Sequence, residues 1–348
     1  MKFRRYVVIV FAVIFWIGVQ NSVAQELTTT ITASAAELQA AVEYWTPERI
    51  RAAEPLPFYD ASADPGADLV YEEPLGPAGS VPGGSPGQSP ASLIVPEESS
   101  DLPDAAGSAV EEDSSDYINY GTPNIFDRTR VNRRSNLSNR YPWIAVGKLF
   151  FSNLAGDLFS CTASIISPNN IIVTAGHCVY NRETQTWYAN WVWMPGYKNG
   201  PQQGTYNWAS ATVLTAWITS GGRMNDVAVI NLEGNPAATT GWLGRSWNQP
   251  IVQHHHSFGY PANIARAEYL VQCTAESYPN CGDNNVYAMG CDQTFGASGG
   301  PWIRTFRYFL SGAMNYVNGV VSGWDSCTGT EGRSYNGARF TSDNIVVL

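Results

Sequence analysis

From about residue 141 to the end of the sequence, short runs of β-branched and aromatic residues recur, and Gly, Asn, Pro or Ser interrupts each run. Many short apolar runs between turn residues are typical of antiparallel barrels and sandwiches, and few stretches here have a helical period. The runs cover residues 141–151, 171–174, 191–194, 211–215, 227–232, 269–272 and 317–321. The sequence therefore predicts an all-β barrel or sandwich.

The first residues predict the compartment. Basic residues at positions 2, 4 and 5 precede an apolar run over residues 6–19, and the small residues Ser22 and Ala24 follow. This is the pattern of a secretory signal peptide, residues 1–24, cleaved after Ala24. The alternative, an uncleaved membrane anchor, is weaker because a bilayer span needs about 20 apolar residues. We expect a secreted, extracellular protein with no membrane attachment after cleavage.

Residues 25–134 are acidic, with 19 acidic and 6 basic side chains, whereas residues 135–348 carry 11 of each. Residues 35–44 hold good helix formers, and a short helix over 47–53 can begin at Pro47 with Thr46 as its cap. Residues 60–116 are rich in Pro, Gly, Ser, Ala and acids, which predicts a disordered linker. The sequence has no basic stripe of the kind that indicates nucleic-acid binding.

Six cysteines in a secreted chain indicate disulfides, and all six lie after residue 160. They are Cys161, Cys178, Cys273, Cys281, Cys291 and Cys327. The part of the chain that carries disulfides is therefore its C-terminal part.

Three local strings carry side chains suited to nucleophilic catalysis: TAGHC at 174–178, NDVAVI at 225–230 and GASGGP at 296–301. A serine hydroxyl such as that of Ser298 needs a neighbouring base, and neutral His177 can accept its proton near pH 7. Asp226 would hold the imidazole tautomer, and the amides of Gly296 and Ser298 would bind the developing oxyanion. Each string alone has an ordinary structural explanation, but their joint occurrence favours an active site.

With these three strings in the order His, Asp, Ser, residues 141–340 resemble the trypsin-like (chymotrypsin-fold) serine peptidases, closest to the secreted bacterial and fungal glutamyl-endopeptidase-like branch. The resemblance implies two antiparallel six-stranded β-barrels, at about 141–245 and 246–348, within a peptidase domain over 135–348. It also implies peptide hydrolysis through an acyl-enzyme, no metal or cofactor, a protein or peptide substrate, and a monomer.

The layout then reads as a zymogen: signal peptide 1–24, acidic and largely disordered propeptide and linker 25–134, and peptidase domain 135–348. Arg133-Arg134 is a candidate processing site, although a solvated basic linker explains the pair as well. Ala297 stands where trypsins carry the aspartate that pairs with the new amino terminus. If the propeptide inhibits, we expect it to block or misfold the site rather than to use that ion pair.

The resemblance implies the Cys161–Cys178 disulfide, which would close the loop beside His177. For the other four cysteines it favours Cys273–Cys291 with Cys281–Cys327. The rival pairing, Cys291–Cys327 with Cys273–Cys281, would match the animal trypsins.

Substrate-pocket residues are implied less sharply. Asp292 lies six residues before Ser298, the spacing of the trypsin pocket aspartate, but it follows a cysteine where trypsin's precedes one, so a structural hydrogen bond is favoured. Ser322, Gly323 and Trp324 are expected to line the pocket and pair with the substrate backbone. The same strand lacks the histidine of glutamyl endopeptidases, so strict Glu preference is not supported.

Three consecutive histidines, His254, His255 and His256, do not suit a shared metal, because successive strand residues point to opposite faces. We expect a loop or an exposed strand there.

Two other functions remain open from the sequence. One is a catalytically silent homologue that binds a protein partner, which a serine-directed covalent probe would fail to label. The other is an esterase, since acyl transfer from an ester uses the same groups.

Overall fold

The computed structural model describes residues 26–60, 76–87, 126–131, 136–281, 283–308, 314–325 and 334–348. The expected signal peptide, the Arg133-Arg134 pair and Cys327 lie outside the described residues. Among the described residues, no helix combines the length and the apolar character that crossing a bilayer requires.

The first sheet closes into a six-stranded antiparallel barrel. Its strand order is β11-β10-β5-β6-β7-β12, and β12 pairs back onto β11. These strands are β5 (Val146–Ser152), β6 (Leu158–Ile165), β7 (Ile171–Thr174), β10 (Ala189–Pro195), β11 (Tyr206–Leu214) and β12 (Ala228–Leu232). Successive side chains of each strand point to opposite faces of the barrel wall, and Phe150, Trp191 and Trp193 are all fully buried.

The second sheet curls into a half-barrel. Its central order is β17-β20-β19-β18-β14-β15. The strands are β13 (Gly244–Trp247), β14 (His254–Gly259), β15 (Val271–Glu276), β16 (Tyr278–Asn280), β17 (Asp283–Met289), β18 (Pro301–Arg304), β19 (Tyr316–Asp325) and β20 (Ser334–Arg339). The mostly β prediction is confirmed, but the two edges that would meet in a closed barrel are instead paired, β15 with β4 (Asp127–Arg130) and β17 with β16. In addition, β13 pairs with β19 in parallel.

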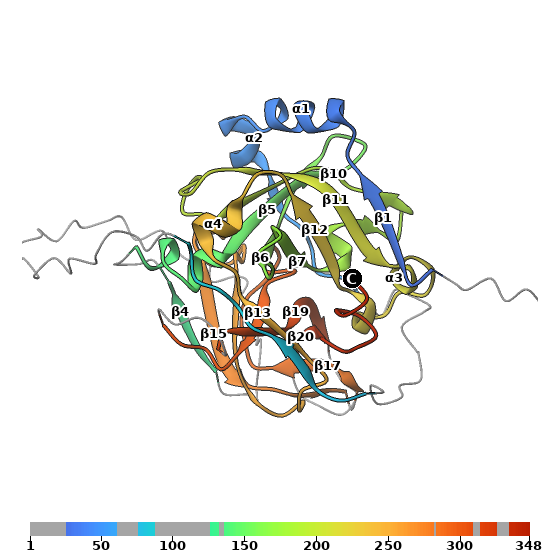
Figure 1. The fold of residues 1–348 in the computed structure, drawn as a ribbon, viewed down its shortest axis with the longest axis vertical. Helices are drawn as coiled ribbons and strands as arrows, with labels where there is room; N and C mark the ends of the chain where they lie inside the picture. The colour runs from blue at the N-terminus through green and yellow to red at the C-terminus, as the bar shows by residue number, and fades with distance from the viewer. Residues whose placement is uncertain are drawn as a thin grey trace, which may run out of the picture.

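The N-terminal segment packs on the first barrel (Figure 1). Strand β1 (Thr28–Thr32) pairs with β11, and β2 (Glu54–Pro55) pairs in parallel with β6. Between them, α1 (Ala35–Tyr44) begins with a capping box of Ser34 and Glu37, and α2 (Pro47–Ala52) begins at Pro47 with the Thr46 hydroxyl accepting from the backbone N–H of Arg49. Both helices match the prediction, because caps and propensity are local signals.

The predicted disordered linker is wrong for residues 76–87. There β3 (Gly79–Val81) pairs with β13 and so joins the second sheet. Backbone pairing supplies the free energy that the polar composition of this stretch does not offer through side-chain burial. Residues 61–75 and 88–116 of the predicted linker lie outside the described residues.

The remaining elements are short. The sequence predicted a strand over 141–151, but a 3₁₀ turn at Trp143–Ala145 precedes β5. The others are β8 (Tyr180–Asn181), β9 (Thr186–Trp187), α3 (Thr215–Thr219), α4 (Pro236–Thr240) and the 3₁₀ turns at Leu137–Asn139, Gly176–Cys178, Arg223–Asn225 and Ala265–Ala267.

Candidate active site

His177 lies in the 3₁₀ turn Gly176–Cys178 that follows β7. The turn is held from both sides. Its last residue, Cys178, forms a disulfide with Cys161 on β6, and the Thr174 hydroxyl at the end of β7 donates to the Thr162 carbonyl at 2.9 Å. The imidazole therefore sits on a braced turn rather than on a free loop.

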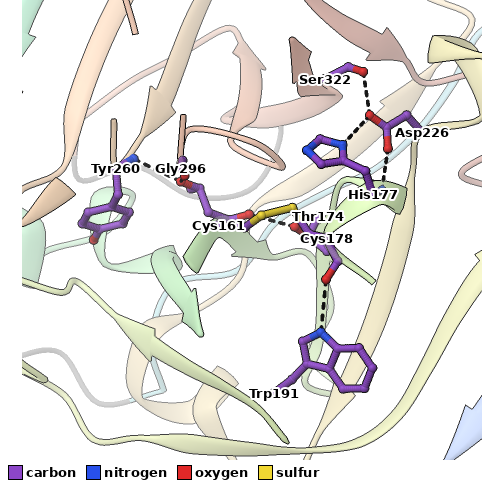
Figure 2. Close-up of a disulfide and its surroundings, with 10 residues drawn as sticks. Cys161, Thr174, His177, Cys178, Trp191, Asp226, Tyr260, Gly296 and Ser322 are labelled. Atoms are coloured by element: carbon purple, nitrogen blue, oxygen red, sulfur yellow. Dashed lines mark hydrogen bonds and ion pairs between the residues drawn. A yellow bond between two sulfur atoms is a disulfide. The ribbon is translucent and has the colours of Figure 1, made fainter. Parts of the chain in front are cut away.

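Asp226 follows the 3₁₀ turn Arg223–Asn225 and is fully buried. Its carboxylate accepts three hydrogen bonds: from the His177 backbone N–H at 2.8 Å, from His177 Nδ1 at 2.8 Å and from the Ser322 hydroxyl at 2.6 Å. Figure 2 shows Ser322, Asp226 and His177 in one hydrogen-bonded row. Because a carboxylate only accepts, Nδ1 donates this hydrogen bond, and Nε2 is the ring nitrogen left for another partner.

Ser298 lies in a tight turn between β17 and β18. Gly296 and Gly299 have φ values of +86° and +76°, which favour glycine. A Cβ on Gly299 would stand 2.1 Å from the Thr174 hydroxyl, so only glycine fits between the turn and β7. Backbone bonds from Thr162 N–H to the Ser298 carbonyl and from Gly299 N–H to the Val321 carbonyl, both 2.8 Å, hold the turn between β6 and β19.

His177 Nε2 and Ser298 Oγ are both buried and have no hydrogen-bond partner among the described residues. Buried polar atoms are normally paired, and an unpaired one costs about 1–3 kcal/mol. A free lone pair on a fixed imidazole and a free hydroxyl are the two groups that an activated serine requires.

The amide of Gly296 points toward residues from the N-terminal segment. Its N–H donates to the Leu56 carbonyl at 3.2 Å, while its own carbonyl accepts from the Thr162 hydroxyl at 2.9 Å. The Thr162 hydroxyl in turn accepts from the Tyr260 N–H at 3.0 Å. An N–H at this position that already binds a carbonyl oxygen can bind an oxyanion.

The family model described as Trypsin matches residues 131–338, more than half of the chain. The chain belongs to the trypsin family. Among curated proteins, this chain is 33% identical over 110 residues to a protein from Bacillus subtilis (strain 168) that is named "Extracellular metalloprotease". The match covers 30% of this chain and only 34% of the length of that relative.

Two solved structures share the trypsin-family fold of this chain. A thermostable serine protease from an extremophilic microorganism has a TM-score of 0.51 and 24% identity, over 60% of this chain and 94% of the other. A Glu endopeptidase in complex with MPD has a TM-score of 0.50 and 23% identity, over 63% of this chain and 94% of the other.

Both disulfides that the trypsin-family resemblance implied within the described residues are present: Cys161–Cys178 and Cys273–Cys291. The rival pairing, which would join Cys273 to Cys281, is therefore excluded. Cys281 is also disulfide-bonded, and the expected partner, Cys327, lies outside the described residues.

Asp292 is placed as a structural residue. Its carboxylate lies 3.3 Å from Arg128 Nε on β4, and its carbonyl accepts from the Asn263 amide at 2.8 Å. These contacts tie the start of the loop that carries Ser298 to the edge strand β4. They agree with the structural hydrogen bond favoured from the sequence rather than with a pocket charge of the trypsin kind.

The three expected pocket residues on β19 differ in their surroundings. Ser322 is fully buried and its hydroxyl donates to Asp226, while its expected place in the pocket and its pairing with the substrate backbone stay a prediction. The Trp324 ring packs edge-to-face on Phe58 at 4.8 Å between centroids. Gly323 lies under the same segment, because a Cβ there would stand 3.2 Å from the Cβ of Phe58.

Sequence reasoning missed two groups beside this site. Arg223, three residues before Asp226, is 5% exposed and forms two hydrogen bonds with Asp325, at 2.7 and 2.8 Å. The other group is residues 54–60, where the apolar and aromatic string PLPFY within an acidic region was the available signal. A lone arginine before an aspartate carries no comparable signal.

The three histidines lie on β14 and alternate as predicted: His254 is exposed, His255 is fully buried and His256 is half-buried. The strand pairs with β15 and β18, so it is an interior strand and not the expected loop or exposed strand. Within the described ranges, two clusters bring three potential metal ligands together, Cys161, His177 and Cys178, and Cys273, Cys291 and Asp292. In each, both sulfurs are disulfide-bonded, which leaves no thiolate pair for a metal.

Proposed function

We propose that this chain is a secreted serine endopeptidase with His177, Asp226 and Ser298 as its triad. Membership of the trypsin family supports peptide hydrolysis. The observation that carries the assignment of residues is the fixed His177 ring, whose Nδ1 is bound by Asp226 while Nε2 and the Ser298 hydroxyl are both buried and unpartnered among the described residues. Secretion is supported by the N-terminal sequence and by the disulfides.

In the proposed mechanism Ser298 Oγ attacks the carbonyl carbon of the scissile bond while His177 Nε2 takes the hydroxyl proton. The electron pair moves to the carbonyl oxygen, which the N–H groups of Gly296 and Ser298 bind. The intermediate collapses as the amine leaves with the proton from His177. Water, deprotonated by the same ring, then hydrolyses the acyl-enzyme and frees Ser298.

The active site is proposed to lie between the first barrel and the curled second sheet, with one chain as the working unit. A peptide or protein is the proposed substrate, and residues 25–134 are the proposed propeptide. The charge that develops on the His177 ring is offset by the buried Asp226 carboxylate, so the chemistry needs no further ionisable group.

Labelling with a fluorophosphonate probe tests the proposal. The processed protein, from which the proposed propeptide has been removed, is expected to incorporate one probe molecule. The Ser298→Ala variant is expected to incorporate none. Ser246→Ala is the matched control, because Ser246 is another fully buried serine whose hydroxyl has no partner among the described residues. It should label like the wild type. Correctly folded wild-type protein that takes up no probe would instead favour the silent protein-binding homologue.

A comparison of peptide and ester substrates separates endopeptidase from esterase. An enzyme of the proposed kind cleaves internal peptide bonds in a peptide library, and the Ser298→Ala variant does not. Hydrolysis of activated esters alone, with every peptide left intact, would contradict the proposed endopeptidase activity.

A further inference from the structure

The segment that follows α2 crosses the candidate active site. Strand β2 runs parallel to β6, with Pro55 opposite Ser160, and Leu56 N–H donates to the Ser160 carbonyl at 2.9 Å. Ser160 immediately precedes Cys161 of the disulfide beside His177. The chain therefore enters the site along β6 as an added strand, bound through its backbone.

The next contact occupies a proposed oxyanion donor. The carbonyl of Leu56 accepts from Gly296 N–H at 3.2 Å, and Leu56 is buried. A Cβ on Gly296 would stand 2.9 Å from the Cβ of Pro55, so the segment lies directly on the serine loop. A substrate carbonyl bound to the same N–H cannot enter while Leu56 is there.

Beyond Leu56, Phe58 fills a group of three aromatic side chains, here called the aromatic cluster: Phe295, Trp324 and Tyr335. Its ring lies 5.8, 4.8 and 6.2 Å from theirs, between centroids, each time edge-on. Burial raises the pKa of Tyr335 far above its usual range, so its hydroxyl stays neutral. The cluster thus presents an uncharged surface suited to an aromatic ring.

Tyr59 covers the catalytic histidine. Its ring lies nearly parallel to that of His177, with centroids 6.4 Å apart, and edge-on to Trp217 at 4.9 Å. Its carbonyl accepts from Arg223 Nη1 at 3.1 Å, and its hydroxyl accepts from the Gly222 N–H at 3.3 Å. Within four residues, therefore, the segment contacts an oxyanion donor, the aromatic cluster and the histidine.

We propose that residues 54–60 are an intramolecular inhibitor that occupies the substrate site, with Phe58 as its anchor in the aromatic cluster. This inference rests on the proposed function, since it assigns an occupant to that same site. It also names the class of side chain that the cluster accepts from a substrate: aromatic or large and apolar.

Two prolines make this segment an inhibitor rather than a substrate. The carbonyl at the Gly296 N–H belongs to the Leu56–Pro57 bond, whose leaving nitrogen is tertiary and carries ring carbons where the His177 proton would be delivered. Pro55 and Pro57 also restrict φ before docking, which lowers the entropy lost on binding. The segment therefore binds well and presents a bond that is cleaved poorly.

The first experiment measures how fast Ser298 reacts with a fluorophosphonate probe in the intact chain, with labelled species separated by size. The intact wild-type chain is expected to react at least tenfold more slowly than protein freed of residues 26–60 by limited proteolysis after folding. The Phe58→Ala chain should react at least tenfold faster than the intact wild type.

Tyr44→Ala is the matched control. Tyr44 is an aromatic residue of the same N-terminal segment whose described ring contacts are with Trp45 and Arg49, and the variant should react like the wild type. Intact wild-type chain that reacts as fast as the processed protein would overturn the inference.

A synthetic peptide with the sequence of residues 54–60 keeps the inference testable if the Phe58→Ala chain fails to fold. The peptide should inhibit the processed protein competitively and survive uncleaved, and the same peptide carrying Phe58→Ala should inhibit at least tenfold less well. Rapid cleavage between Leu56 and Pro57, or equal potency of the two peptides, would contradict it.

Binding of a fluorescent form of the peptide to the processed protein separates this inference from the proposed function. If the processed protein takes up no probe, the proposed function fails. Peptide binding that depends on Phe58 would still support occupancy of the site, and absence of binding would refute it.

Discussion

Two buried polar atoms, His177 Nε2 and Ser298 Oγ, have no partner in the described part of the chain even though a segment covers them. Tyr59 of that segment lies over the His177 ring, with centroids 6.4 Å apart, and the Leu56 carbonyl binds the Gly296 N–H in the turn that carries Ser298. An unpaired buried polar atom costs about 1–3 kcal/mol, and Ser246 Oγ, outside the site, is unpaired in the same way. In the proposed mechanism His177 Nε2 and Ser298 Oγ are the two atoms between which the serine proton passes.

In the proposed mechanism Ser322 acts on the reaction through Asp226, as a positioning residue. Ser322→Ala removes one of the three hydrogen bonds to the buried carboxylate, and hydrogen bonds to charged groups are worth about 1.5–3 kcal/mol. We expect kcat of the processed protein to fall about tenfold or more with little change in KM, because Asp226 offsets the charge that the His177 ring gains in the reaction.

Steady-state kinetics with a peptide substrate measure kcat and KM. Ser246→Ala is the control, because it makes the same Ser-to-Ala change at a buried serine outside the site. Unchanged kcat in Ser322→Ala, or an effect confined to KM, would show that the hydroxyl does not support the carboxylate.

His255 predicts how stability depends on pH. Burial lowers its pKa to about 3, while its ring bonds to the Asn318 amide oxygen at 2.8 Å and to the Ser277 hydroxyl at 2.9 Å. Since the unfolded pKa is about 6.5, the unfolded chain binds more protons between pH 6.5 and 3. Stability is therefore complete above about pH 6.5 and decreases as the pH falls, by up to about 1.4 kcal/mol per pH unit from this residue.

Urea unfolding between pH 7 and pH 4 checks this dependence. His255→Gln should flatten the curve without abolishing it, because burial also lowers the pKa of its neighbour His256, to about 4. A wild-type stability that rises on acidification would contradict the prediction.

At the level of elements, β19 joins the two halves of the site. On this strand the Ser322 hydroxyl bonds to Asp226, and the Trp324 ring packs on Phe58. The strand ends at Asp325, which pairs with Arg223 in the 3₁₀ turn before β12. Arg223 also donates to the carbonyls of Trp324 and Tyr59. One guanidinium thus connects the turn before Asp226, strand β19 and residues 54–60.

A double-mutant cycle with Arg223→Met and Asp325→Asn measures this connection. We expect a coupling of about 1–3 kcal/mol in the free energy of unfolding, because the guanidinium is buried and bound in two places while the carboxylate is partly exposed. The exposed pair Arg51 and Glu48 is the control and should couple by less than about 0.5 kcal/mol. Equal coupling in the two cycles would mean that the buried pair does not tie the elements together.

At the level of the whole molecule, the proposed inhibitory segment, residues 54–60, is anchored by the residues that precede it, far from the site it covers. All five residues of β1 pair with β11, the Asn207 amide donates to the Leu38 carbonyl at 2.7 Å, and the Trp45 indole N–H donates to the Asn190 carbonyl at 2.6 Å. The Trp45 ring also packs on Phe150 at 5.6 Å. We expect these contacts to hold residues 54–60 in place even when the chain after them is cut.

A single cut after residue 60 should therefore leave the enzyme inhibited. While the chain is intact, the segment binds at a high effective concentration, and after the cut its release depends on dilution. We expect the activity per molecule of the nicked protein to rise as it is diluted, and to rise sooner for the nicked Trp45→Ala variant. Full activity immediately after the cut, at every concentration, would show that the anchors do not hold the segment.

The sequence alone determined what local chemistry encodes. The helices at 35–44 and 47–52, the runs that became β7 and β12, and the three strings around His177, Asp226 and Ser298 are each specified by residues near one another in the chain. The family followed from those strings taken together, and the disulfide pairing followed from the family.

Only the tertiary structure decided which distant groups meet. The Ser322 hydroxyl finds Asp226 from 96 residues away, Arg223 binds Asp325, and Leu56 lies on Gly296, although no pattern in the sequence pairs them. The edges of the second sheet were likewise taken by β4 and β16 through backbone hydrogen bonds, which any residue except proline can form. Contacts of this kind depend on how the two sheets and the N-terminal segment pack on one another. Packing of the whole chain decides this, rather than the residues on either side of each contact.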